Sequence, residues 1–188
     1  MKIIGITGTI GAGKGTIVDY LAIHYNFAHY SVRGYLIKEI TRRGLPVNRD
    51  TMVMVANELR THNSPSFITD ELYKEAVQEG KNAIIESIRT FGEIDSLRKT
   101  DDFVLLAIDA DPKVRYQRIV KRNSETDQIS FDTFLDNEAR EMTATDANKQ
   151  NLATCIRRAD YVLTNNEDFD NLYQQIDKVM KALNIKLT

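Results

Sequence analysis

Apolar residues occur in short runs along this chain, separated by longer stretches with helical spacing. The runs at 3–7, 27–30, 82–87, 103–109 and 161–164 contain few polar residues, which is typical of strands buried on both faces of a sheet. Between these runs, apolar positions recur every three or four residues, which predicts helices. The pattern therefore predicts an α/β fold with a parallel sheet of about five strands and helices on both faces.

The predicted helices occupy the stretches between the runs. They cover about 17–23, 32–43, 51–61, 67–79, 91–97, 112–122, 131–142, 147–158 and 169–183. Ser31 and Asp50 are placed to cap two of these helices, and Gly80 to end a third. In parallel sheets, ligands bind beyond the carboxyl ends of the strands, so residues directly after strands are the candidates for chemistry.

A glycine-rich segment follows the first predicted strand and precedes a helix. It consists of Gly8, Thr9, Ile10, Gly11, Ala12, Gly13, Lys14, Gly15 and Thr16. Glycines let backbone N–H groups converge on an anion, and the N-terminus of the next helix adds partial positive charge. Lys14 supplies a full charge that can reach the outer phosphates of ATP. The segment therefore predicts a phosphate-binding loop, here called the P-loop.

One position of the P-loop departs from the usual pattern. Gly15 follows Lys14 where Ser or Thr is usual, and the hydroxyl comes one residue later, at Thr16. We expect Thr16 to contact a phosphate, or Mg²⁺ through water, with the metal held mostly by ATP oxygens.

Two further candidates lie at or just after the end of the strand at 82–87. A carboxylate at Glu86 is placed to hold a water on Mg²⁺ or to orient the attacking group. Arg89 is placed to grip an acceptor phosphate through paired N–H donors. Ser31 and Arg33 begin the helix after the second strand, where an arginine in the first turn is unfavourable unless it serves an anion. We therefore expect Ser31, Arg33, Glu86 and Arg89 to bind the acceptor.

A basic helix at 112–122 leads into a polar stretch at 123–150. Arg118 and Arg122 are expected to contact ATP and to close over the transferring phosphoryl group, together with Arg140 from the polar stretch. We interpret 123–150 as a lid and 31–80 as an acceptor-binding segment. Arg115 shares a face with the other two arginines of the helix and is expected to be exposed.

Composition limits the remaining possibilities. At 188 residues, 1–188 is expected to form a single domain. A net charge of −2 gives no electrostatic reason to expect nucleic acid or an acidic membrane as a partner. Cys155 is the sole cysteine, which excludes an intrachain disulfide and suits a cytoplasmic location. We expect neither a signal peptide nor a membrane span at the N-terminus, and the oligomeric state is left open. The three histidines lack metal-ligand spacing and are assigned to packing or surface.

With these residues identified, most of the chain resembles nucleoside monophosphate kinases of the adenylate and cytidylate kinase type. It also resembles a mainly archaeal group of adenylate-kinase-related P-loop proteins. Gly-Ala-Gly-Lys-Gly-Thr at 11–16, Glu-Ser-Ile-Arg at 86–89 and Arg-Ile-Val-Lys-Arg at 118–122 carry the resemblance. It implies transfer of the γ-phosphate of ATP to a small nucleotide, with Mg²⁺ as cofactor. It also implies that the turn at Asn165 lies beside the donor adenine.

Two alternatives stay open. The last third of the chain also resembles dephospho-CoA kinase, although the loop of that family usually reads Lys-Ser-Thr where this chain has Lys-Gly-Thr. An ATP-binding regulatory protein without kinase activity is an alternative of another class.

The chain also departs from the monophosphate kinase pattern at two places. Ser87 replaces a glycine that is usual in these kinases, and the lid lacks the cysteine cluster of their zinc-bearing version.

Overall fold

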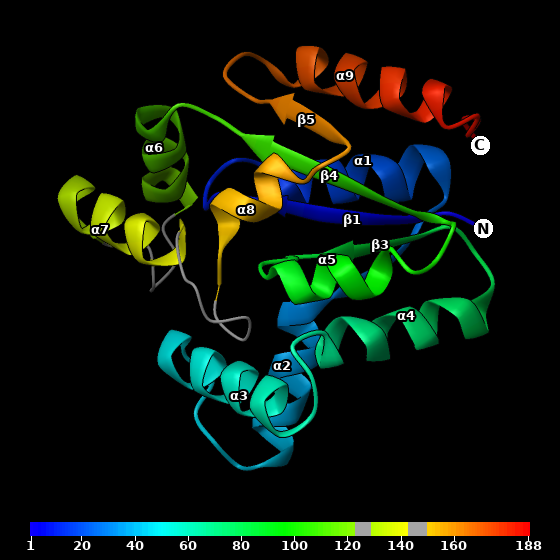
Figure 1. The fold of residues 1–188 in the computed structure, drawn as a ribbon. Helices are drawn as coiled ribbons and strands as arrows, with labels where there is room; N and C mark the ends of the chain where they lie inside the picture. Colours follow the sequence, from blue (N-terminus) through cyan, green and yellow to red (C-terminus); the bar gives the residue numbers. More distant parts are fainter. Residues whose placement is uncertain (123–128, 143–149) are drawn as a thin grey trace.

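A single parallel sheet forms the centre of the fold in the computed structural model, which describes residues 1–122, 129–142 and 150–188 (Figure 1). Within those residues the sheet has five strands in the order β2-β3-β1-β4-β5, and every neighbouring pair is parallel. The strands are β1 (Ile3–Gly8), β2 (Ala28–Ser31), β3 (Ala83–Glu86), β4 (Phe103–Asp109) and β5 (Tyr161–Thr164). The predicted fold class is confirmed.

Helices connect the strands and flank the sheet. They are α1 (Lys14–Tyr25), α2 (Val32–Arg42), α3 (Arg49–His62), α4 (Phe67–Glu79), α5 (Phe91–Leu97), α6 (Pro112–Arg122), α7 (Phe131–Met142), α8 (Leu152–Arg157) and α9 (Phe169–Ala182). The predicted caps at Ser31 and Gly80 are confirmed. The Ser31 side chain accepts a hydrogen bond from the Gly34 N–H at 3.2 Å, and Gly80 ends α4 in a left-handed conformation.

The two faces of the sheet bury separate cores, because successive side chains of a strand point to opposite faces. Ile4 and Ile6 of β1 pack with residues of α1 and α9 in one core. Ile3 belongs to the other core, which includes residues of α2, α3, α4, α5 and α8. Cys155 lies in this second core, as expected of a packing residue. In Figure 1, α9 lies on one side of the sheet, and α4 and α5 lie on the other.

The start of α3 differs from the prediction. The helix begins at Arg49, because the Asn48 side chain accepts a hydrogen bond from the Thr51 N–H at 2.8 Å. The predicted cap, Asp50, lies instead in the first turn, where its charge suits the helix dipole. The earlier start places Arg49 at the end of α3 that approaches α7.

Two other helices also begin elsewhere than predicted. The first, α1, begins at Lys14 directly after the glycines of the loop, three residues earlier than the apolar spacing indicates. The helix predicted at 147–158 begins at Leu152, because the Asn151 side chain accepts a hydrogen bond from the Thr154 N–H. Residues 147–149 lie outside the described residues, as does most of the predicted lid other than α7.

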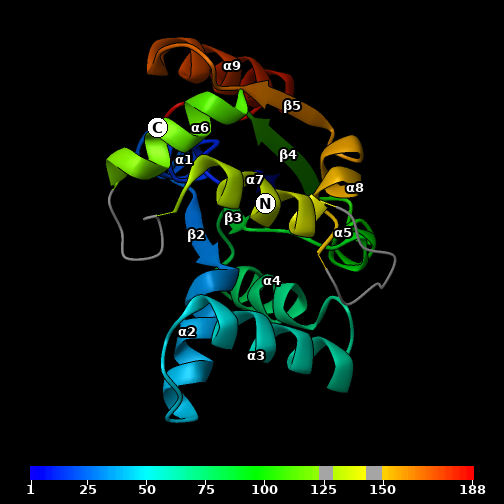
Figure 2. The same cartoon turned by 90° about the vertical axis from the view of Figure 1, so that its left-hand side faces the viewer.

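The carboxyl ends of the strands lie at one edge of the sheet and bring the candidate residues together. In the strand register Ser31 is opposite Glu86, and Gly8 is opposite Ile108. Helices α2 and α3 extend beyond the sheet on this side, and Figure 2 shows α7 between them and α6. No helix among the described residues is long and apolar enough to cross a membrane.

Candidate nucleotide-binding site

The P-loop curls around the side chain of Lys14. The Lys14 Nζ donates hydrogen bonds of 2.9 Å to the carbonyl oxygens of Gly8 and Thr9. Gly13 has a φ of 107°, and a Cβ there would lie 2.4 Å from the Asn165 amide nitrogen. Glycine is therefore required at this position by both conformation and space. The structure thus places Lys14 inside the loop, as predicted.

The ammonium group of Lys14 is destabilised in this position. Burial and the nearby Arg89 guanidinium lower the pKa of Lys14 from its ordinary 10.5 to about 8. The carboxylates of Glu86 and Glu141 oppose this change, and Arg115 adds to it. A polyphosphate beside Lys14 would supply the missing negative charge, so the loop is electrostatically prepared for an anion.

Glu86 ends β3 at the same edge of the sheet. Its carboxylate accepts a hydrogen bond from the His29 ring, with 3.1 Å between the Glu86 Oε2 and the His29 Nε2. This hydrogen bond, the charges of Lys14 and Arg89, and the His29 charge hold the pKa of Glu86 below its usual value. Glu86 is therefore an acceptor of hydrogen bonds at neutral pH. His29 was assigned to packing or surface because the histidines lack metal-ligand spacing, so its contact with Glu86 was not predicted.

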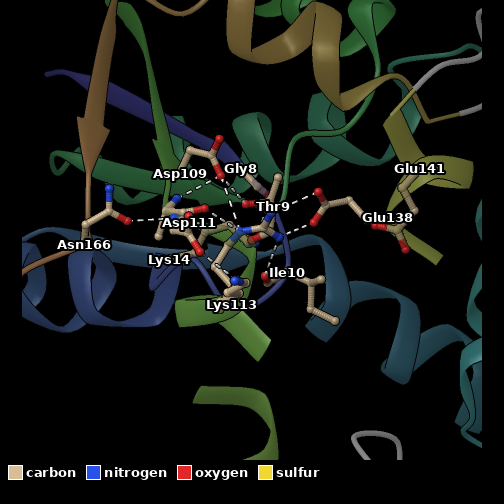
Figure 3. Close-up of polar contacts among 12 residues, drawn as sticks. Gly8, Thr9, Ile10, Lys14, Asp109, Asp111, Lys113, Glu138, Glu141 and Asn166 are labelled. Carbon is tan, nitrogen blue, oxygen red and sulfur yellow. Dashed lines mark hydrogen bonds and ion pairs between the residues drawn. The ribbon is translucent and has the colours of Figure 1, made fainter. Parts of the chain in front are cut away.

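Asp109 ends β4 on the other side of the P-loop. Its Oδ1 accepts a hydrogen bond of 2.7 Å from the Thr9 hydroxyl (Figure 3). The same oxygen accepts a bond from the N–H of Ala110. Asp109 thereby fixes the loop to the strand end. Asp109 lies at a strand end, where ligands of parallel sheets are expected, but its hydrogen-bond partner was not predicted.

Arg115 is buried, and the prediction that it is an exposed residue is wrong. Its side chain is 2% exposed, and its Nε donates a hydrogen bond of 2.7 Å to the Ala110 carbonyl. Both of its terminal nitrogens donate to the Glu138 carboxylate of α7, and one of them also donates to the Ile10 carbonyl of the P-loop. Figure 3 shows Glu138 directed from α7 towards the loop residues. Arg115 therefore joins α6, α7 and the loop.

Arg118 and Asn165 form a chain of hydrogen bonds that reaches the P-loop at Ala12. Arg118 Nη2 donates to the Asn165 Oδ1 at 3.2 Å, and the Asn165 amide donates to the Ala12 carbonyl at 2.8 Å. The Arg118 Nη1 is buried and has no hydrogen-bond partner among the described residues. Burial lowers the pKa of Arg118 from its ordinary value. The structure thus brings these two predicted ATP-binding residues together beside the loop.

The predicted acceptor residues lie beside the ends of β2 and β3, whereas Arg118 and Asn165 follow β4 and β5, on the other side of β1. Ser31 is partly occupied by capping α2, and Arg33 is exposed on the first turn of that helix. Arg89 is half-buried, and its Nη1 donates to Glu141 of α7 at 2.7 Å and to Gln150 at 2.8 Å. Arg122 and Arg140 are exposed in the last turns of α6 and α7. The roles predicted for these side chains remain predictions.

The main chain of Arg89 is held by a buried carboxylate that the sequence did not reveal. Glu93 is fully buried and accepts hydrogen bonds from the N–H groups of Arg89 and Thr90, at 2.8 and 3.0 Å. Arg60 of α3, which is 3% exposed, compensates the charge with a hydrogen bond of 3.1 Å. This buried pair fixes the position from which the Arg89 side chain extends.

The side chains near the loop limit how a metal could be held. Within residues 1–122, 129–142 and 150–188, no group of three or more His, Cys, Asp or Glu residues is arranged to bind a metal ion. Mg²⁺ commonly keeps several waters and takes its other oxygens from phosphates and one or two carboxylates. The Thr16 hydroxyl and the Glu86 carboxylate fit this mode of binding.

Comparison with known proteins gives relatives along nearly the whole chain. The model of an AAA domain family, AAA_18, matches residues 4–146. The UPF0200 protein of Methanococcus vannielii is 31% identical over 186 residues, which cover 97% of each protein. The solved structure of TT1252 from Thermus thermophilus has a TM-score of 0.66 at 18% identity over 97% of each chain. Shikimate kinase from Bacteroides thetaiotaomicron has a TM-score of 0.56 at 16% identity, covering 97% of this chain and 98% of that one. The sheet, loop and helices form a P-loop kinase-like fold.

Proposed function

The chain belongs to the UPF0200 family and to the AAA_18 family of AAA domains, and we propose that it is an ATP-dependent kinase of a small nucleotide. One observation carries the proposal. In the strand register Glu86 at the end of β3 is opposite Ile6 of β1, two residues before the P-loop begins at Gly8. The charges of Glu86 and Arg89 both act on the Lys14 ammonium inside the loop. Phosphoryl transfer uses cations that neutralise the phosphates and a group that orients the attacking oxygen, and a loop that only binds ATP has no use for the second of these.

On the donor side, the residues neutralise and position the phosphates of ATP. Lys14 and the loop N–H groups contact the outer phosphates, and Arg118 and Asn165 lie where the rest of the nucleotide would extend. The exposed Arg122 and Arg140 would approach the transferring group when 123–150 covers the site. Arginines at that group stabilise the charge that develops in the transition state.

On the acceptor side, the segment 31–80 would hold a nucleoside monophosphate. Arg89 binds its phosphate, while Ser31 and Arg33 lie at the start of α2 on the same flank. Glu86 orients the attacking oxygen and, with Thr16, would hold Mg²⁺ through water. When bound, Mg²⁺ would neutralise charge on the donor phosphates. All parts belong to one domain in this proposal.

A screen of acceptors tests the proposal. The protein is supplied with Mg-ATP and, separately, with each ribo- and deoxyribonucleoside monophosphate and dephospho-CoA, and ADP formation is measured. We expect turnover with a monophosphate. Turnover with dephospho-CoA alone would favour that kinase instead. ATP binding without turnover of any acceptor would favour a regulatory protein and would contradict the proposal.

A variant of the P-loop connects any turnover with this site. Lys14→Ala should abolish turnover and retain cooperative unfolding, because a loop lysine contributes little to the core. Lys113→Ala is the matched control, since Lys113 is an exposed lysine of α6. Equal activity of the two variants would show that the measured turnover does not arise in the P-loop.

A further inference from the structure

Glu141 of α7 lies between two arginines that come from different parts of the chain. Its Oε2 accepts a hydrogen bond of 2.7 Å from Arg89, which follows β3, and its Oε1 accepts one of 2.5 Å from Arg49, the first residue of α3. Each carboxylate oxygen therefore has its own guanidinium. We call Arg49 and Arg89 the arginine pair.

The arginine pair is not neutralised by its carboxylate. Among the described residues, two guanidinium groups donate hydrogen bonds to one carboxylate, and Gln150 adds only a neutral oxygen to Arg89 at 2.8 Å. Glu86 acts on Arg89 through its charge. The two arginine side chains are 41% and 26% exposed, so an ion from solvent can approach them. A dianion with several oxygens would match two guanidinium groups better than one carboxylate does.

This group lies beside the P-loop. Ile88, the residue before Arg89, donates its N–H to the Ile6 carbonyl at 3.1 Å and accepts a hydrogen bond of 2.8 Å from the Thr7 hydroxyl, so Arg89 extends from the end of β1 that leads into the P-loop. In agreement, the charges of Arg89 and Glu141 both act on the pKa of Lys14. The helix α7 also has contacts that do not involve Glu141. Glu138 and Phe134, on the same helix, are held by Arg115 and by the ring of Tyr116.

We propose that the arginine pair binds the phosphate of the acceptor and that Glu141 is its internal occupant, which the phosphate displaces. The inference rests on the proposed function and makes it more specific. The acceptor carries a phosphate dianion, Arg49 is its second ligand, and Glu141 sets the affinity that an acceptor must exceed. An acceptor with one negative charge would replace Glu141 without gain and would therefore bind weakly.

Binding of inorganic phosphate tests this inference without any turnover. The P-loop is first saturated with Mg²⁺ and the β,γ-imido analogue of ATP, so that added phosphate meets only the acceptor side. Titration is followed by the side-chain N–H signals of Arg49 and Arg89 in nuclear magnetic resonance spectra. Glu141→Gln should bind phosphate about tenfold more tightly than the unaltered protein, because an ionised competitor becomes a neutral one.

Two further variants isolate the cause. Asp136→Asn removes the same charge from an exposed position of α7 and should change the affinity less than twofold. Glu141→Gln combined with Arg49→Gln should lose the gain. The inference is overturned if Glu141→Gln binds no more tightly than Asp136→Asn, or if the double variant keeps the gain. A chain without kinase activity can still pass this test, and an active kinase can still fail it, so the two proposals fail separately.

Discussion

Glu138 and Glu141 lie three residues apart on α7, and both accept hydrogen bonds from arginine, but they face different surroundings. Glu138 meets one guanidinium that is 2% exposed and that also donates to the carbonyls of Ala110 and Ile10. Glu141 meets two guanidiniums that solvent reaches. A contact between arginine and glutamate therefore holds α7 against the loop at Glu138. At Glu141 the same kind of contact is open to replacement by a ligand.

The largest difference between the two positions should follow removal of an arginine. Arg115→Met leaves the Glu138 charge and two carbonyls without their donor, and we expect a loss of about 3 kcal/mol in the free energy of unfolding. Arg49→Met, the matched change beside Glu141, should cost about 1 kcal/mol or less, because Glu141 keeps its hydrogen bond to Arg89. Urea unfolding of both variants measures the difference. Equal losses would show that the two arginines are equivalent in stability.

A smaller difference should follow neutralisation of each acid. Glu138→Gln weakens both bonds of a buried guanidinium and should destabilise the fold by about 1–3 kcal/mol. Glu141→Gln should change stability by about 0.5 kcal/mol or less, since Arg89 keeps its hydrogen bond to Gln150. Thermal unfolding of the two proteins checks the order. A larger effect at position 141 would mean that Glu141 is a structural anchor and not a replaceable occupant.

A last expected effect concerns the protonation of Lys14. Because the pKa of Lys14 is about 8 in the folded chain and 10.5 in the unfolded chain, the unfolded state binds more protons between these values. The stability of the free protein should therefore rise with pH across that window. Binding of ATP should raise the pKa of Lys14, so at pH 9 the complex should take up part of a proton.

Calorimetry of ATP binding in two buffers with different heats of ionisation measures this uptake. Lys14→Met should abolish it, and Glu141→Gln should increase it, because the Glu141 charge raises the pKa of Lys14 in the free protein. Release of protons at pH 9 would contradict the assignment of Lys14 to the phosphates.

Local patterns predicted the sheet, most helices and the P-loop. Buried strands on a parallel sheet are recognised by unbroken apolar runs, and Gly13 and Lys14 are fixed by the geometry of one short loop. The sequence also predicted that Glu86 and Arg89 follow a strand on the edge that carries the loop. These features depend on neighbours in sequence or on a general rule of parallel sheets.

The arginine contacts depend on distant partners and were harder to predict. Arg115 was mistaken for a surface residue because it lies in a basic run, although Ile119, one turn later and fully buried, indicates that this face of α6 turns inward. Arg49 and Glu141 are separated by 92 positions, and no local pattern links them. Their meeting depends on how α3 and α7 are placed by the rest of the fold.

The spacing of the two carboxylates on α7 also limits how the gene can change. Each residue of an α-helix turns about 100° around the axis, so one inserted or deleted codon between 138 and 141 would rotate one carboxylate away from its arginines. A substitution at either position alters one contact and leaves the other, whereas a change of length removes one of them whichever residue is gained or lost. Homologous proteins that keep both contacts should therefore vary in the residues between these positions but not in their number.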